Sequence, residues 1–306
     1  MRKVDFRQTG HIHAVFREVF TGGSKGIGKE IALALVHQGC SVSIIARNAA
    51  DLDLAVSEIN ALAKSVGSQA TAHAYLLDVV DAFEAIENVV KKAEDEVGPI
   101  DILINNAGRS VQNAFDILPL HEFEAQLKIN YLSAVHVTRA VLPSMKKFQR
   151  GTIVFVCTAA AECPIWGYTA YAASKCALRG FFESLHMELL PYNIGVSIIY
   201  PPNTDTEGFQ EELKTMPKEV KEITGSGGIV SPKYVADCLL NGIANGKTNI
   251  YVGFEGWLLG LLSAGGAPES SFFQVVLQVL LAGLLRGIML IYIGNFNRVV
   301  QWCRAK

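Results

Sequence analysis

The sequence predicts an α/β fold in which a doubly wound parallel sheet is followed by a hydrophobic C-terminal segment. From about residue 20 to residue 200, short apolar stretches alternate with helical stretches, a pattern typical of a parallel sheet covered by helices on both faces. A glycine-rich stretch opens the first helix, and long apolar runs lie near the C-terminal end of the sequence. Together these observations predict one large α/β domain with a hydrophobic appendage.

The composition favours a large apolar core and argues against a nucleic-acid partner. Half of the 306 residues are hydrophobic, which leaves apolar residues to spare after a core is built. The 27 basic residues do not outnumber the 29 acidic residues, so the basic surface that nucleic acid attracts is not expected. The six cysteines have neither a CxxC nor a Cys/His ligand spacing, which predicts reduced thiols in a cytosol-facing protein and no metal site.

Short, β-branched segments that are apolar on both faces are the predicted strands, as buried parallel strands require: 42–46, 72–77, 100–105, 152–157 and 195–200. Helices are predicted over 26–37, 50–65, 82–96, 120–145 and 168–190. A first strand is expected over 14–20, but it would contain Arg17 and Glu18, and a central strand should not bury adjacent unpaired charges. Either this strand begins later than usual, or residues 1–20 form an atypical N-terminal segment.

The glycine-rich stretch predicts a phosphate cradle at the start of the first helix. Glycines allow a tight turn and let a pyrophosphate approach backbone N–H groups at a helix N-terminus. A glycine-rich loop alone can also be an ordinary strand-to-helix turn. The predicted cradle of this Rossmann-type sheet consists of Gly22, Ser24, Lys25, Gly26, Ile27 and Gly28.

The residues after the second strand favour NADP(H) as the cofactor. An NAD-binding protein would place an acidic residue there to hold the ribose 2′-hydroxyl, whereas this chain has Arg47. Arg47 and Lys25 together place two cations near the adenosine ribose, which favours a 2′-phosphate; two solvated surface charges are the alternative. Asp78 is expected to meet the adenine ring. The small residues after the fourth strand would let the cofactor lie against the backbone: Asn106, Ala107 and Gly108.

The predicted chemical centre is a tyrosine and a lysine four positions apart on one face of a helix, Tyr171 and Lys175. A neighbouring Lys⁺ and an oxidised nicotinamide would lower the tyrosine pKa from its ordinary value of about 10. Tyr171 could then donate a proton to a carbonyl oxygen as hydride reaches the carbon. This spacing can arise by chance, but its position after the fifth predicted strand of a cofactor-binding sheet favours a catalytic role for the pair.

In this order and spacing, the motifs resemble the short-chain dehydrogenase/reductase family. The resemblance implies that Thr158, in the place of the family's serine, hydrogen-bonds the substrate oxygen, and that Asn130 holds a water for proton relay. Lys175 would also bond the nicotinamide ribose. The segment PPNTDT at 201–206 matches the family's PGxxxT, so Thr204 would line the nicotinamide and Thr206 would hold its carboxamide.

The segments 168–193 and 199–212 resemble the branch of this family that acts on long-chain keto lipids. This branch implies NADPH-dependent reduction of the 3-keto group of a sphingoid base, at the endoplasmic reticulum membrane with the catalytic domain facing the cytosol. The chain departs from the branch at Thr158, at Glu207 in place of a proline, and at Asp51 where a lysine often supports the 2′-phosphate. The alternatives are a hydroxysteroid or retinoid dehydrogenase and a weakly active NADP(H)-binding scaffold.

The C-terminal segment is the predicted membrane contact. Residues 272–294 contain one charge, Arg286, and are long enough to span a bilayer, while 258–267 are shorter and fit a re-entrant or interfacial segment. Arg286 is expected to reach a headgroup or to face protein. The predicted division is therefore an N-terminal segment over 1–20, a dinucleotide-binding catalytic domain over 21–250 and a hydrophobic tail over 251–306. The oligomeric state stays open, a homo-oligomer included.

Overall fold

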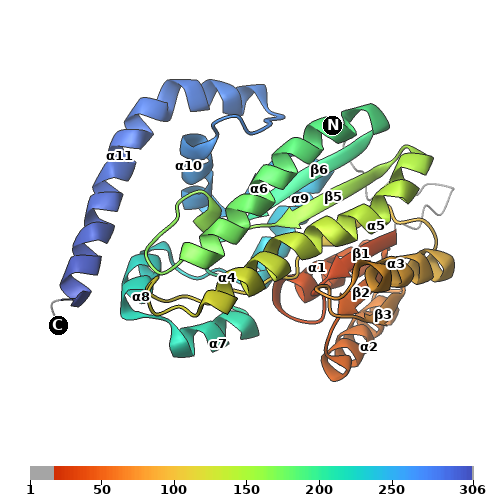
Figure 1. The fold of residues 1–306 in the computed structure, drawn as a ribbon. Coiled ribbons are helices and arrows are strands. Elements are labelled where there is room, and N and C mark those ends of the chain that lie inside the picture. The colour runs from red at the N-terminus through yellow and green to blue at the C-terminus, as the bar shows by residue number, and fades with distance from the viewer. Residues whose placement is uncertain (1–16, 305–306) are drawn as a thin grey trace.

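The computed structural model describes residues 17–304, apart from the side chain of Ser226, and these residues form a parallel sheet between two layers of helices (Figure 1). The sheet has seven strands in the order β3-β2-β1-β4-β5-β6-β7, and each neighbouring pair is parallel. The prediction of a doubly wound parallel sheet is confirmed. The strands are β1 (Arg17–Thr21), β2 (Ser41–Ala46), β3 (Ala72–Leu76), β4 (Ile102–Asn105), β5 (Gly151–Val156), β6 (Ile194–Tyr200) and β7 (Asn249–Tyr251).

Helices cover both faces of the sheet because its strands are apolar on both sides. One buried cluster joins the sheet to α1 (Gly26–His37), α2 (Ala49–Ser65) and α9 (Pro232–Ala244). A second joins it to α3 (Phe83–Val97), α5 (Ser133–Phe148) and α6 (Thr169–Leu189). The remaining helices lie beside the carboxyl edge or beyond β7: α4 (Leu120–Leu127), α7 (Glu207–Thr215), α8 (Lys218–Thr224), α10 (Gly253–Ser263) and α11 (Phe272–Arg304).

The helical segment predicted over 120–145 is present over 120–148, but it is not α-helical throughout. Lys128–Leu132 form a π-helical turn between α4 and α5. A π turn inserts one extra residue into the helical ladder, and such turns are frequent at functional sites. Here the turn carries the buried Asn130, whose amide makes the contacts described below. Apolar periodicity does not reveal this interruption, because the helix resumes with its inner face on the same core.

The first strand contains a buried glutamate, Glu18, although a central strand was not expected to bury an ionisable side chain without a partner of opposite charge. β1 pairs with both β2 and β4, so it is central, and Glu18 is 1% exposed. Its carboxyl has the buried Cys40 thiol, a weak donor, as a hydrogen-bonding neighbour. Burial raises the pKa of this carboxyl well above its ordinary value. The strand is tolerated because Glu18 is buried as a neutral acid, which avoids most of the cost of burying a charge.

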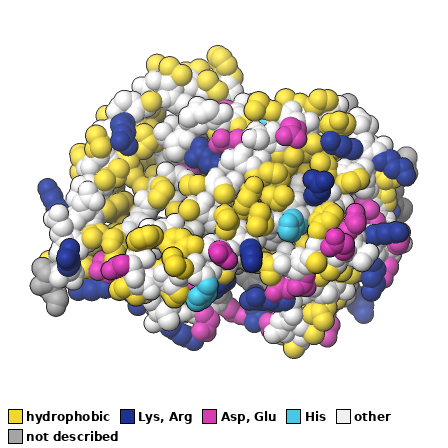
Figure 2. Space-filling model, viewed as in Figure 1, with side chains coloured by type: hydrophobic (Ala, Val, Ile, Leu, Met, Phe, Trp, Pro, Cys, Tyr) yellow, Lys and Arg dark blue, Asp and Glu magenta, His cyan; other side chains and the backbone are white. Residues whose placement is uncertain are grey.

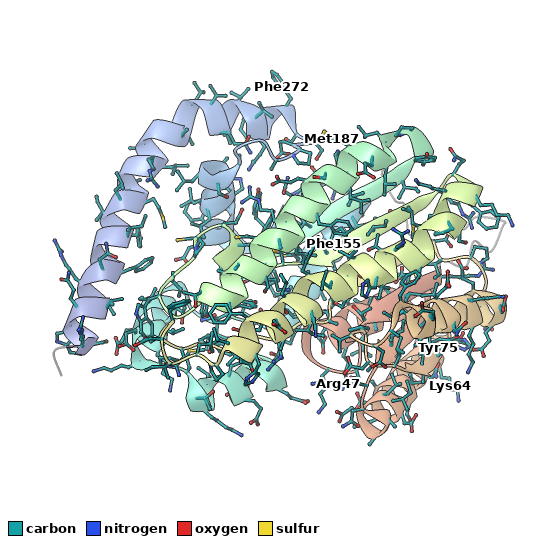
Figure 3. All side chains as sticks on the ribbon, in the orientation of Figure 1. Arg47, Lys64, Tyr75, Phe155, Met187 and Phe272 are labelled. Carbon is teal, nitrogen blue, oxygen red and sulfur yellow. The ribbon has the colours of Figure 1, made fainter. Side chains whose placement is uncertain are left out.

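The C-terminal helices lie against one end of the catalytic body (Figure 1). α11 has 33 residues, which corresponds to about 50 Å, and is the one helix of the described chain long and apolar enough to cross a membrane. Its most apolar window is 6% buried, and Figure 2 shows hydrophobic side chains along this region. Phe272 at its start is 84% exposed and points away from the body (Figure 3). This long apolar helix is consistent with membrane association.

α11 is held to the body near both of its ends. Near its start, the Trp257 ring nitrogen donates a hydrogen bond to Gln274 at 3.0 Å. Near its end, the Lys218 ammonium lies 4.1 Å from the centre of the Trp302 ring, a cation–π contact. Between them, Arg286 lines a cavity under the helix and therefore faces protein, one of the two placements expected for it. The helix is thus attached to α10 at its start and to α8 at its end.

Candidate active site

The loop between β1 and α1 forms a cradle with room only for glycine at its key positions. Gly22 has φ +66°, a left-handed conformation that other residues rarely adopt. A Cβ on Gly28 would lie 2.5 Å from the Gly22 carbonyl oxygen and 2.6 Å from the Asn106 amide nitrogen. α1 begins without a side-chain cap at Lys25, which leaves its first N–H groups for a ligand. This cradle fits the pyrophosphate of a dinucleotide.

Not every residue predicted for the cradle faces its open side. Ser24 and Lys25 belong to the turn itself, and Lys25 is exposed. The side chain of Ile27 instead packs against the apolar cluster under α1.

A hydrogen-bonded tie joins the ends of β1 and β4. The Asn106 amide donates to the Thr21 and Gly22 carbonyl oxygens at 3.1 and 3.0 Å. The Thr21 hydroxyl accepts from the backbone N–H groups of Asn106 and Ala107 at 3.0 and 3.1 Å. The sequence analysis gave Thr21 no role, although it opens the glycine motif. The tie spans the point at which the strand order reverses, where doubly wound folds bind ligands.

Tyr171 and Thr158 meet at the carboxyl edge of the sheet. Thr158 follows β5, and its hydroxyl accepts from the Ala160 N–H at 3.3 Å. Tyr171 lies in the first turn of α6. Its ring packs edge-on against the ring of Tyr168, with 5.4 Å between the two ring centres. Burial raises the pKa of the Tyr171 hydroxyl, and a hydrogen bond from Thr158 offsets part of this rise. Thr158 therefore places its hydroxyl beside that of Tyr171.

Lys175 is buried one turn further along α6. Its ammonium donates to the Val156 carbonyl oxygen at 2.9 Å, and burial lowers its pKa. The sequence analysis expected a neighbouring Lys⁺ to lower the pKa of Tyr171, but in this structure burial dominates and the pKa is raised. The reason is that the ammonium is turned toward β5. The effect of an oxidised nicotinamide on the Tyr171 pKa stays a prediction, because it applies only when the cofactor is bound.

Asn130 holds the loop after β4 next to Lys175. Its amide oxygen accepts from the Arg109 N–H at 2.9 Å, and its nitrogen donates to the Arg109 carbonyl at 2.9 Å and to the Ser174 hydroxyl at 3.0 Å. A Cβ on Gly108 would lie 2.8 Å from the Asn130 amide oxygen and 3.3 Å from the Lys175 ammonium. Asn130, Gly108 and Lys175 are thus brought together, with Ser174 as a further contact that was not predicted from the sequence.

The predicted adenosine end carries two cations, each near a carboxylate. A guanidinium nitrogen of Arg47 lies 3.7 Å from a carboxylate oxygen of Asp78, and Figure 3 shows Arg47 at the edge of the molecule. Lys25 contacts Asp51 at 3.0 Å and Glu207 at 3.1 Å, and these hydrogen bonds raise its pKa. Asp51 and Glu207, two of the positions at which the chain departs from the branch pattern, therefore both bind Lys25. A 2′-phosphate at Lys25 would compete with both carboxylates.

The segment after β6 brings two threonines beside the cradle. The Thr204 hydroxyl is buried and donates to the Pro202 carbonyl oxygen at 2.9 Å. Thr206 caps α7, because its hydroxyl accepts from the Phe209 N–H at 3.1 Å. A Cβ on Gly26 would lie 3.0 Å from the Thr206 methyl group. Thr206 therefore touches the glycine loop, and Thr204 lies at the base of the same segment.

A cavity of about 350 Å³ runs from the catalytic edge to the C-terminal helices. At one end it is lined by Thr158, Tyr168 and Asn203. Its other walls are mainly apolar side chains from α10 and α11: Leu258, Leu259, Leu262, Leu285, Ile288, Met289, Tyr292 and Phe296. The sequence analysis assigned residues 251–306 to membrane contact alone, so it missed this wall. No motif signals it, because the wall forms only when α11 folds back over α10.

Residues 18–217 match the model of the short chain dehydrogenase family, and the chain belongs to this family. It is accordingly an oxidoreductase with a site for a nicotinamide dinucleotide, whose pyrophosphate the cradle at Gly22 and Gly28 fits.

Similar proteins include sphingoid-base reductases and a hydroxysteroid dehydrogenase. A 3-ketodihydrosphingosine reductase of Bos taurus is 39% identical over 93% of this chain and 85% of its own length. A 3-dehydrosphinganine reductase of Danio rerio is 38% identical, with the same coverage of 93% and 85%. Among solved structures, a 7α-hydroxysteroid dehydrogenase complexed with NADH and 7-oxo glycochenodeoxycholic acid is 28% identical, with a TM-score of 0.66 over 74% of this chain and 87% of that one.

Proposed function

We propose that this chain reduces the 3-keto group of 3-ketodihydrosphingosine to the hydroxyl group of dihydrosphingosine in sphingolipid synthesis, with NADPH as the hydride donor. Its similarity to reductases of this name over most of both chains supports the substrate class. The single structural observation that carries the proposal is the apolar cavity that begins at Thr158 and Tyr168. It offers an alkyl chain an apolar path that starts at the reacting carbonyl.

The reduction needs a hydride at C3 and a proton at the carbonyl oxygen. The nicotinamide supplies the hydride when it is bound. Tyr171 donates the proton, and its raised pKa keeps the hydroxyl protonated at neutral pH until the oxygen becomes basic. Thr158 donates a hydrogen bond to the same oxygen, and its hydrogen bond to Tyr171 favours the tyrosinate left behind. Lys175, whose ammonium is turned toward β5 in this structure, would hold the nicotinamide ribose. A relay water that returns the proton to Tyr171 would lie near Asn130, whose amide is bonded to the Arg109 backbone and to the Ser174 hydroxyl.

The preference for NADPH rests on Arg47. Its guanidinium is 73% exposed, and its contact with Asp78 at 3.7 Å is a weak surface pair that a phosphate can displace. A planar guanidinium can bind a phosphate with two parallel hydrogen bonds. Lys25 contributes less, because Asp51 and Glu207 already occupy its ammonium.

The place of action in this proposal is the cytosolic face of the endoplasmic reticulum membrane, where sphingoid bases partition and NADPH is available. α11 lies in the interface with its outer face in the lipid. Val279, Leu284 and Ile291 on that face are 76%, 65% and 74% exposed, an apolar surface suited to a bilayer. Because both ends of α11 touch the body, the cavity mouth and the membrane surface meet along the same helix.

The proposed reaction is tested with purified full-length protein, NADPH and either 3-ketodihydrosphingosine or a 7-oxo steroid, with products identified by mass spectrometry. The steroid is the second candidate because of the solved hydroxysteroid dehydrogenase. We expect the sphingoid ketone to react with a kcat/KM at least about tenfold higher, which corresponds to 1.4 kcal/mol. A preference for the steroid, or binding of NADPH without turnover of either ketone, would refute the proposal and favour the steroid dehydrogenase or scaffold function, respectively.

Two adjacent leucines of α11 point to different faces of the helix, so their variants test cavity binding and membrane binding separately. Leu285 is 9% exposed and lines the cavity, whereas Leu284 is 65% exposed. Leu285→Ala should lower kcat/KM for the long-chain ketone and leave membrane binding unchanged. Leu284→Asp, combined with Ile291→Asp, should release the protein from lipid vesicles without reducing turnover of a detergent-dispersed ketone. Equal effects of the two variants on both measurements would contradict the division of α11 into two faces.

A further inference from the structure

Glu212 is an acidic side chain near Tyr171 that the reduction chemistry does not use. Its helix, α7, packs over the active site, because Phe209 and Met216 join Tyr168 in one buried cluster with Tyr171 at its margin. Glu212 is half-buried on this helix. Burial raises the pKa values of the Tyr168 and Tyr171 hydroxyls, and the charge of Glu212 adds to both increases. The carboxylate is therefore within electrostatic reach of the catalytic hydroxyl.

The carboxylate of Glu212 has neutral partners only. It accepts a hydrogen bond from the Gln112 amide at 3.0 Å and another from the Ser110 backbone N–H. None of the salt bridges within residues 17–304 involves it. Burial raises its pKa to about 6, so at neutral pH it is mostly an anion in a desolvated place without a compensating cation. Such a group is suited to a cation that arrives with a ligand.

The substrate of the proposed function carries such a cation. Its C2 amine is bonded to the carbon next to the reacting C3 carbonyl, so the ammonium must lie close to the Tyr171 hydroxyl when Tyr171 and Thr158 hold the carbonyl oxygen. The cavity walls from α10 and α11 are apolar apart from Glu255, which is considered below. The site therefore has one anion near the reacting oxygen and an apolar cavity for the chain, which matches an amphiphilic amino ketone.

We propose that the Glu212 carboxylate, held by Gln112, binds the substrate ammonium and selects 2-amino ketones over neutral long-chain ketones. This inference rests on the proposed function and adds a specificity residue to it. Glu255 is the other acid near the chain: it lines the cavity at α10, close to Gly227. It is exposed, so water screens its charge, and we assign the ammonium to Glu212.

The test compares two substrates in four proteins. The substrates are 3-ketodihydrosphingosine and the same long-chain hydroxy ketone without its 2-amino group, and the proteins are the wild type and Glu212→Gln, Glu211→Gln and Glu255→Gln. Glu211 is the matched control, an exposed neighbour on α7 that is bonded to Lys214. Glutamine at 212 can still accept from Gln112, and it removes a desolvated charge, so the melting temperature should stay equal or rise.

Glu212→Gln should lower kcat/KM for the amino ketone by about 10- to 100-fold, the range for one charge-assisted hydrogen bond, and change the value for the des-amino ketone less than threefold. Glu211→Gln should behave as wild type, and any effect of Glu255→Gln should be equal for the two ketones. Equal loss on both ketones would make Glu212 a structural residue, and selective loss in Glu255→Gln alone would move the ammonium site to α10; either result overturns the inference. Wild-type protein that reduces neither ketone would refute the proposed function itself, and the inference with it.

Discussion

Arg47→Ala should change the cofactor preference without changing the fold. The Arg47 side chain is 73% exposed, and its one ion pair, with Asp78, spans 3.7 Å. A surface pair of this kind contributes about 0–1 kcal/mol, so the free energy of unfolding should barely change. A charge-assisted hydrogen bond from Arg47 to the 2′-phosphate is worth about 1.5–3 kcal/mol, so KM for NADPH should rise about 10- to 150-fold. KM for NADH should stay constant, because NADH has no 2′-phosphate.

The assay measures KM for both cofactors at a saturating concentration of keto substrate, together with the melting temperature. Asp51→Asn is the opposite perturbation, because it removes one of the two carboxylates that hold Lys25. It should free Lys25 in part and lower KM for NADPH a few-fold. An equal rise for both cofactors in Arg47→Ala, or no rise for either, would refute the assignment of Arg47 to the 2′-phosphate.

Three further predictions address the catalytic edge and the core. Tyr171→Phe should bind NADPH nearly as wild type in a fluorescence titration yet lose about 10²- to 10⁴-fold in turnover, and substantial turnover would contradict its role as proton donor. Thr158→Ala should lower turnover by about 10²-fold and Thr158→Ser should retain it; an unchanged alanine variant would show that the hydroxyl takes no part. Glu18 has a raised pKa in the folded state, so the folded state binds the extra proton and stability falls as pH rises from about 4.3 through that folded-state pKa. Glu18→Gln should therefore raise the melting temperature at pH 8 more than at pH 5, and a pH-independent effect would contradict burial as a neutral acid.

Much of the fold could be predicted because its signals are local. Apolar runs of five or six residues indicated β2 to β6, and the predicted bounds of α1, Gly26–His37, are those of the structure. The glycine motif implied a cradle, and the structure shows why Gly28 is required there: a Cβ would collide with the Gly22 carbonyl oxygen. The spacing of Tyr171 and Lys175 placed both on α6. Backbone conformation and helix periodicity depend on near neighbours, so sequence patterns report them.

The tertiary structure decided the features that depend on distant residues. Glu18 enters a central strand because the surroundings of β1 keep its carboxyl neutral, and Lys25 is neutralised by Asp51 and Glu207, which lie 26 and 182 positions away in the sequence. The wall of the cavity belongs to α11, which is more than 100 residues beyond Thr158. A side chain's protonation, ion pairs and contact with a cavity depend on the dielectric and the charges around it in three dimensions. Those surroundings exist only after the chain has folded, so the sequence determined the family and the elements, and tertiary packing determined which charges are free to act.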